Sequence, residues 1–332
     1  MNEPARSLPD FSDIQAAAER LKGIAVMTPL VPSPVLSDRF GSPILLKLET
    51  LQRTGSFKFR GAYNRLVQLA AAERRRGVVA FSSGNHAQGI AAAAALLGIP
   101  ATIVMPADAP KIKADSARAL GASIVPYDRK RENREEIAAR IAKENGAVVV
   151  PSFDDAQIVS GQGTIGIELA AQAVAIGLKL DAVLVPCSGG GLASGIALGL
   201  SGASPGTRVF AVEPEGYDGA RLSLERGKRI AAAGTRETIA DALMSPAPGI
   251  IPFALLQSCA AGGVAISDAA LARAVGFAAI ELKLVVEPGG AAGLAALLSG
   301  AYDARGQTVA VVLSGGNVDP EMLQRCLVEF SA

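Results

Sequence analysis

Residues 181–213 read DAVLVPCSGGGLASGIALGLSGASPGTRVFAVE. The apolar run at 181–186 predicts a strand buried on both faces, and the glycines that follow lead into a stretch of small residues that predicts a helix. A second strand is predicted at 209–213. A strand, a glycine loop, a helix and a further strand in this order indicate an α/β fold with a mainly parallel sheet.

The same alternation extends back to about Arg76. Short β-branched runs predict strands at 78–81, 101–105, 123–126, 147–150 and 308–313. Runs rich in Ala, Leu and charged residues predict helices at 86–97, 111–120 and 132–144, and Ser267 is a predicted N-cap of a helix that reaches Leu282. No repeat or linker stands out, so composition does not locate a domain boundary.

Length and charge exclude several classes of protein. The 332 residues are enough for two domains with large cores. Lys and Arg total 32 against 31 for Asp and Glu, so there is no basic surplus to attract nucleic acid or an anionic membrane. No signal peptide or membrane span is predicted. The widely spaced Cys187, Cys259 and Cys326 fit neither a disulfide framework nor a zinc site, and we expect a cytoplasmic protein.

The first segment whose residues could take part in a reaction is GSFKFRG at 55–61. Lys58 lies between Phe57 and Phe59, where a Gly-Ser turn predicts the start of a helix. Burial lowers the pKa of a lysine because it disfavours the ammonium form, and a neutral amine can attack a carbonyl. A solvated lysine at a helix start is the alternative interpretation of this segment by itself.

The second segment, FSSGNHAQG at 81–89, lies at the carboxyl end of a predicted strand, where open α/β sheets bind ligands. Backbone N–H groups at the start of the next helix can receive a carboxylate. An ordinary strand-to-helix turn with a polar cap is the alternative. The segment contains His86, the single histidine of the chain, and we interpret its side chain as packed or capping.

Two glycine-rich turns follow later strands, PCSGGGL at 186–192 and LSGGN at 313–317. Glycines let the backbone approach an anion closely, so the first turn predicts a phosphate site. It could instead be part of a dinucleotide fingerprint with Glu213 as the ribose-binding acid, but the third glycine of Gly-x-Gly-x-x-Gly is replaced by Ser194. The second turn could equally be a plain tight turn.

Together and in this order, the four segments resemble the serine/threonine dehydratase and serine racemase family. These are fold-type II pyridoxal-phosphate (PLP) enzymes, similar to the tryptophan synthase β subunit. The resemblance extends from Thr28-Pro29-Leu30 to Asn317-Val318-Asp319. It implies two doubly wound, mainly parallel sheets in two domains: a large PLP-binding domain of residues 1–76 and 152–332, and a small domain of residues 77–151 inserted in it. It also implies that the chain lacks a C-terminal regulatory domain and forms a homodimer.

The resemblance assigns roles in binding the cofactor, pyridoxal 5'-phosphate. Lys58 would hold it as a Schiff base and then act as the base at Cα, while Phe57 would pack against its ring. Asn85 would bind the ring hydroxyl oxygen, and Ser314 would face the pyridine nitrogen. The phosphate would be bound by Ser188, Gly189, Gly190, Gly191 and Leu192.

The resemblance also assigns substrate residues. Ser83 and the backbone of Asn85, His86 and Ala87 would bind the substrate carboxylate, and Ser83 would be catalytic in a racemase. Ser245 and Arg131 resemble a substrate-side hydroxyl and an arginine that approaches when the small domain closes, although each could be solvated. Glu213 resembles a ligand of a divalent cation, Mg²⁺ or Ca²⁺. Its usual aspartate partner is replaced by Gly219 and only Asp218 is near.

The leading hypothesis is a lyase that converts L-threonine and L-serine to a 2-oxo acid and ammonia. A 3-hydroxyaspartate dehydratase and a serine or aspartate racemase are alternatives on the same scaffold. A nicotinamide-dependent oxidoreductase that uses the Gly189 loop, and an amino-acid sensor without catalysis, are rivals from other classes.

Overall fold

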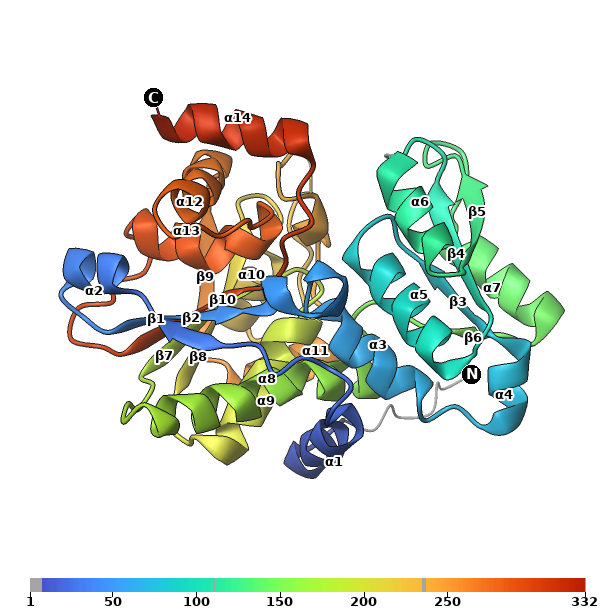
Figure 1. Ribbon diagram of the computed structural model, residues 1–332, viewed down its shortest axis with the longest axis horizontal. Coiled ribbons are helices and arrows are strands. Elements are labelled where there is room, and N and C mark those ends of the chain that lie inside the picture. The colour runs from blue at the N-terminus through green and yellow to red at the C-terminus, as the bar shows by residue number, and fades with distance from the viewer. Residues whose placement is uncertain (1–7, 110, 235–236, 332) are drawn as a thin grey trace.

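The computed structural model describes residues 8–109, 111–234 and 237–331. The chain forms two lobes, each built on a sheet with helices on both faces (Figure 1). Both sheets are mainly parallel. The α/β fold expected from the alternating pattern is therefore confirmed.

The large sheet has the strand order β1-β2-β10-β7-β8-β9. Only the edge pair β1 and β2 is antiparallel. The central strand β10 pairs with β2 at Val309 and Ile44, so segments far apart in sequence complete one sheet. The strands are β1 (Leu30–Pro32), β2 (Ile44–Leu48), β7 (Ala182–Pro186), β8 (Arg208–Pro214), β9 (Gly262–Ile266) and β10 (Val309–Leu313).

The small sheet has the order β5-β4-β3-β6, and every pair in it is parallel. Its strands are β3 (Val78–Phe81), β4 (Ala101–Pro106), β5 (Ser123–Tyr127) and β6 (Val148–Val149). All four lie inside the stretch predicted as the inserted domain, and β3 has the predicted bounds.

Helices cover both faces of each sheet (Figure 1). In the large lobe α12 and α13 pack on one face, where Leu184 and Val311 point, and α8 and α9 pack on the other, where Val183 and Ala310 point. Neighbouring residues of each strand are thus buried on opposite sides. The helices are α1 (Phe11–Leu21), α2 (Pro34–Phe40), α3 (Lys58–Leu66), α4 (Ala71–Arg76), α5 (Asn85–Leu97), α6 (Lys111–Ala119), α7 (Arg134–Asn145), α8 (Ala156–Ala175), α9 (Gly191–Ala203), α10 (Gly219–Arg226), α11 (Ile250–Cys259), α12 (Asp268–Ile280), α13 (Ala292–Leu298) and α14 (Pro320–Ser331), with 3-10 turns η1 (Glu49–Leu51), η2 (Arg53–Gly55), η3 (Asp241–Leu243) and η4 (Gly289–Ala291).

A buried cluster of four charged side chains fixes the start of α3. Arg60, only 1% exposed, donates to both oxygens of Glu49 and to both oxygens of Glu168 on α8. Lys47 of β2 also donates to Glu168, at 2.6 Å. Two cations thus meet two anions, which offsets the cost of removing them from water. Because Arg60 follows Lys58 by two residues, the cluster holds the backbone that carries Lys58.

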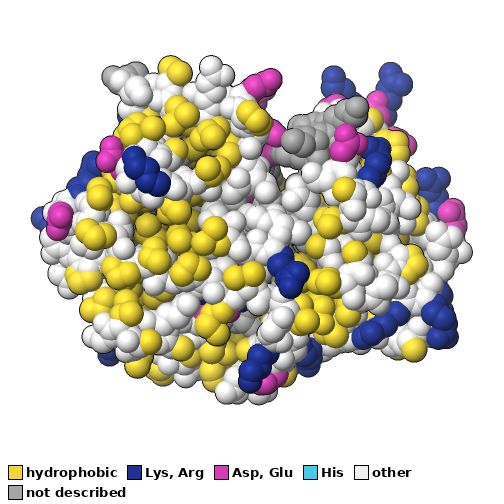
Figure 2. Space-filling model, in the orientation of Figure 1, with side chains coloured by type: hydrophobic (Ala, Val, Ile, Leu, Met, Phe, Trp, Pro, Cys, Tyr) yellow, Lys and Arg dark blue, Asp and Glu magenta, His cyan; other side chains and the backbone are white. Residues whose placement is uncertain are grey.

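On the face drawn in Figure 2, the two lobes expose different kinds of side chain. Hydrophobic side chains gather over the left-hand, larger lobe, and Lys and Arg side chains lie mostly over the right-hand, smaller lobe. Within the described ranges, no helix is both long and apolar enough to cross a membrane.

Candidate active site

Lys58 is the first residue of α3, with its amine inside the protein. The amine donates to the carbonyl oxygen of Ser152 at 2.9 Å and lies 5.1 Å from the centre of the Phe57 ring. Burial lowers the pKa of Lys58 to about 8, and the charge of Glu287 acts in the opposite direction. Lys58 is therefore a lysine that readily loses its proton, which is what a nucleophilic or basic amine requires.

The turn at 82–84 leads from β3 into α5, which lies against the backbone of Lys58 at Gly89. A Cβ on Gly89 would lie 3.1 Å from the carbonyl carbon of Lys58, a tight contact that favours a glycine here. Within the described chain, the N–H groups of Asn85, His86 and Ala87 have no acceptor. Three unpaired donors at a helix N-terminus form a site for a carboxylate. Ser83 is half-buried in the same turn.

The side chain of His86 is structural. It is 2% exposed and its Nε2 lies 3.1 Å from the carbonyl oxygen of Val150. Burial, together with the charge of Lys58, lowers the pKa of His86 to about 3. The imidazole is therefore neutral at physiological pH, in agreement with the packed side chain that we expected.

The glycine loop after β7 has the geometry of an anion site. Gly190 has φ +89°, which favours glycine, and α9 begins at the next residue. A Cβ on Gly189 would lie 2.4 Å from ring atoms of Phe153, so the loop can pass Phe153 only without a side chain. In the part of the chain that the structure describes, the N–H groups of Gly189, Gly190 and Gly191 have no backbone acceptor. These N–H groups are thus available to a phosphate.

The turn after β10 closes the site from the other side. The backbone N–H of Phe57 donates to the carbonyl oxygen of Ser314 at 3.1 Å, so Ser314 lies directly behind the Lys58 segment. The next residue, Gly315, accepts a hydrogen bond from the backbone N–H of Glu287. Asn85 donates to the Glu287 carboxylate at 2.5 Å and accepts from Asn317 at 2.7 Å.

Contacts therefore join four segments that are distant in sequence. Lys58 contacts Ser152, the next residue Phe153 packs on the phosphate loop, and Glu287 and Asn85 link the Ser314 turn to α5. Glu287 could not be predicted from the sequence, because one acid before a Pro-Gly-Gly turn gives no distinctive signal.

The structure places the two further substrate-side candidates, Arg131 and Ser245, in different surroundings. The Arg131 side chain is 86% exposed, and its ion-pair partner is Asp128 at 3.7 Å, so no observed contact brings it to the site. Another arginine was missed: Arg134, at the start of α7, lies 5.4 Å over the ring of Phe81, which directly precedes the 82–84 turn. Ser245 contacts the phosphate loop, since its N–H donates to the Ser188 hydroxyl while its own hydroxyl donates to Ala247.

The predicted cation ligands already have partners. Both carboxylate oxygens of Glu213 accept from backbone N–H groups at the start of α10, those of Ala220 and Arg221. Asp218 forms an ion pair with the Arg221 side chain. No group of three or more His, Cys, Asp or Glu side chains suited to a metal occurs in the described residues. A cation at Glu213 and Asp218 thus stays a prediction without support, and the same contacts disfavour Glu213 as a ribose ligand.

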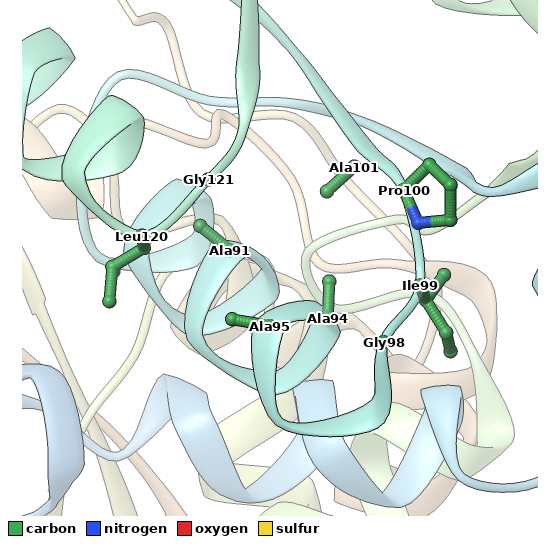
Figure 3. Close-up of a pocket in the computed structure, with 9 residues that line it drawn as sticks. All are labelled: Ala91, Ala94, Ala95, Gly98, Ile99, Pro100, Ala101, Leu120 and Gly121. Carbon is green, nitrogen blue, oxygen red and sulfur yellow. The ribbon is translucent and has the colours of Figure 1, made fainter.

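A separate pocket lies at the far end of α5 (Figure 3). Its lining consists of small or apolar residues of α5, β4 and the turn after α6, including Ala91, Ala94 and Leu120. It holds no titratable side chain, and about 18 Å of helix separates the ends of α5, so it is not part of the site around Lys58.

Comparison with known proteins matches residues 22–315 to the family described as "Pyridoxal-phosphate dependent enzyme". The chain belongs to this family. The resemblance to serine/threonine dehydratases and serine racemases, and the fold-type II architecture, are thereby confirmed.

Relatives within the PLP family carry different activities. The chain is 45% identical to an L-threo-3-hydroxyaspartate ammonia-lyase of Pseudomonas sp, covering 95% of this chain and 97% of that protein. It is 41% identical to an L-threonine ammonia-lyase of Thermotoga maritima, covering 96% and 78%. The structure of maize serine racemase matches with a TM-score of 0.90 and 34% identity, covering 97% of this chain and 98% of that one.

The residues present fit the cofactor of this PLP family. A phosphate group can accept hydrogen bonds from the unpaired N–H groups of the glycine loop, and an aldehyde can condense with the amine of Lys58. Asn85 uses one of its two amide hydrogens on Glu287, which leaves the second for the ring oxygen. The set of donors thus matches the phosphate, the aldehyde and the ring oxygen of PLP.

Proposed function

We propose that this protein is an ammonia-lyase that eliminates water from 3-hydroxy amino acids. The proton on Cα and the β-hydroxyl leave as water, and hydrolysis of the released imine takes up one water to give a 2-oxo acid and ammonia. The observation that carries this proposal is the low pKa of Lys58 between a carboxylate site and a phosphate site.

Each residue of the site has a defined task in this proposal. When bound, PLP supplies an electron sink for the charge that develops at Cα. Lys58 holds the cofactor and then takes up the Cα proton; its pKa of about 8 leaves about a tenth of the amine unprotonated at pH 7. The N-terminus of α5 orients the substrate through its carboxylate. Ser314 would offer a neutral hydroxyl to the pyridine nitrogen, and a neutral partner there would make the ring a milder electron sink.

Borohydride reduction followed by peptide mapping tests the core of this proposal. The PLP-loaded protein is expected to carry one reduced pyridoxyl group on Lys58. An unmodified Lys58 in a protein without visible absorption would contradict it and would favour the nicotinamide alternative.

The substrate is tested by adding L-threonine, L-serine and 3-hydroxyaspartate separately and following 2-oxo acid release. The family resemblance favours threonine and serine, whereas two relatives, in Pseudomonas sp and Saccharomyces cerevisiae, are L-threo-3-hydroxyaspartate ammonia-lyases. We expect release from at least one of the three. If there is none, chiral analysis of recovered serine and aspartate distinguishes the racemase: D-isomers would establish it and replace the lyase.

Arg134 favours 3-hydroxyaspartate as a second candidate substrate. Its guanidinium lies over the ring of Phe81, the residue before the 82–84 turn, and has no ion-pair partner among the described residues. A second carboxylate on the substrate would supply that partner. In this version of the proposal Arg134 takes the role that was assigned to Arg131.

The matched variants Arg134→Gln and Arg131→Gln separate the two arginines. We expect Arg134→Gln to raise KM for 3-hydroxyaspartate about tenfold or more, since a charged hydrogen bond is lost, with little change for threonine. Arg131→Gln should change neither substrate. Equal losses for both substrates, or an effect of Arg131 alone, would disprove the assignment.

A further inference from the structure

Glu287 is a buried carboxylate that the proposed chemistry does not yet use. It follows α12 in the loop before η4, and its backbone N–H is bound to the carbonyl oxygen of Gly315. The residue is 6% exposed. A Cβ on Gly315 would lie 2.2 Å from Oε1 of Glu287, so the carboxylate occupies the space that a side chain at 315 would take.

A chain of hydrogen bonds fixes which end of the Asn85 amide faces Glu287. The carbonyl oxygen of Thr54 can only accept, and it accepts from Nδ2 of Asn317 at 2.8 Å. The same amide nitrogen donates to Oδ1 of Asn85 at 2.7 Å. Asn85 must therefore present its own Nδ2 to the other side, where it donates to Glu287 at 2.5 Å.

The geometry leaves one N–H of Asn85 for a ligand. An amide nitrogen has two hydrogens, and the Glu287 carboxylate takes one of them. Because a carboxylate accepts more strongly than a neutral group, this bond holds the Asn85 side chain in one orientation. The charge of Glu287 also acts on the amine of Lys58, whose pKa it raises against the effect of burial.

We propose that Glu287 is a positioning residue for the cofactor: it orients the Asn85 amide toward the ring oxygen of PLP and places a negative charge beside the nitrogen of Lys58. This inference rests on the proposed function, since it requires PLP bound at Lys58. Among the described residues, the charged group on which Glu287 is seen to act is the amine of Lys58, and the His86 side chain is neutral. Glu287 thereby acts through Asn85 and does not exchange protons with substrate.

Two substitutions separate the hydrogen bond from the charge. Glu287→Gln keeps an oxygen that can accept from Asn85 but removes the charge, whereas Glu287→Ala removes both. Glu281→Gln is the matched control, since Glu281 is an exposed acid at the end of α12 and lies six residues earlier. Circular dichroism checks that each variant is folded.

The readouts are the dissociation constant of PLP, from equilibrium dialysis, and the pH midpoint of the visible absorption of the bound cofactor. We expect Glu287→Ala to weaken PLP binding about tenfold or more, because Asn85 loses its anchor. In Glu287→Gln binding should stay close to wild type, while the pH midpoint falls by about one unit, because a negative charge that favours the protonated nitrogen is gone. Glu281→Gln should change neither quantity.

The outcomes distinguish this inference from the proposed function. If the wild-type protein does not bind PLP at Lys58, the proposed function fails, and this inference fails with it. If the wild type binds PLP and both Glu287 variants match it in affinity and in pH midpoint, only the role of Glu287 is refuted. If Glu287→Ala does not fold, an unchanged pH midpoint in Glu287→Gln refutes the charge and Asn317→Ala decides the orientation: weaker PLP binding supports it and unchanged binding refutes it.

Discussion

Lys47 is fully buried and Lys58 is partly buried, and the partners of their amines differ. Lys47 donates to Thr28, Glu168 and Gln172, so all three of its N–H groups are bound. Within the described chain, Lys58 has a single hydrogen-bond partner, the neutral carbonyl oxygen of Ser152. Burial lowers the pKa of both amines, and carboxylates oppose the effect at each: Glu168 and Glu49 at Lys47, and Glu287 at Lys58.

The comparison shows that burial alone does not produce a reactive amine. A buried lysine bound to a carboxylate and two further acceptors serves the structure. A buried lysine with one neutral acceptor gives up its proton near pH 8 and is available for chemistry. The difference lies in the partners that surround each amine.

The largest effect should follow from Lys58→Ala. We expect 2-oxo acid formation to fall by about 10⁴-fold or more, since the variant loses both the attachment point and the Cα base. Stability should not fall, because a poorly partnered lysine contributes little to it. Release of 2-oxo acid and a denaturation curve measure the two quantities, and retained activity would remove Lys58 from the mechanism.

For Lys47→Met we expect lower stability with the cofactor still bound, the opposite of what we expect for Lys58→Ala. Loss of one member of the buried cluster should lower the free energy of unfolding by about 3 kcal/mol, since Glu168 loses a partner, while the folded variant still carries PLP on Lys58. Denaturant titration measures this cost. Lys143→Met, on the exposed side of α7, is the control and should shift stability by less than about 0.5 kcal/mol. Equal shifts in the two variants would show that the cluster is unimportant.

A smaller effect is expected from His86. This residue is also a buried base, and its hydrogen-bond partner is the neutral carbonyl oxygen of Val150. The unfolded chain binds a proton near pH 6.5, but the folded chain binds it only near pH 3, so acid favours unfolding. The stability is complete above about pH 6.5 and is lost as the pH falls toward 3. Between pH 7 and 5 the apo protein should lose about 2 kcal/mol more than His86→Gln. Parallel stability curves for the two proteins would contradict this.

Strands made of continuous apolar residues could be predicted from sequence, and others could not. The strand at 78–81 was predicted without error, and that at 101–105 ends one residue later in the structure. Strand β2 was missed, and it contains Lys47, whose burial depends on partners more than 100 residues away. Strand β9 begins with Gly262 and Gly263, and the second approaches the backbone of Arg221 so closely that a side chain would not fit.

Some residues of the candidate site could likewise be predicted from the sequence, and others could not. Lys58, Asn85 and the glycine loop lie in local motifs, and the structure brings them together. Glu287 enters the site only because β10 places Gly315 beside it, which no local pattern reveals. Arg131 and Arg134 occupy one charged segment, and which of them lies over Phe81 depends on where α7 begins.

The position of β10 in the large sheet also sets an order for folding during synthesis. The small sheet uses only residues from Val78 to Val149, so it can form while the rest of the chain is still being made. The large sheet has a gap between β2 and β7 until Val309 to Leu313 leave the ribosome. Ser314 and its contact with Phe57 come later still. A nascent chain therefore acquires its cofactor site only after Ser314 has left the ribosome, long after Lys58 has been made.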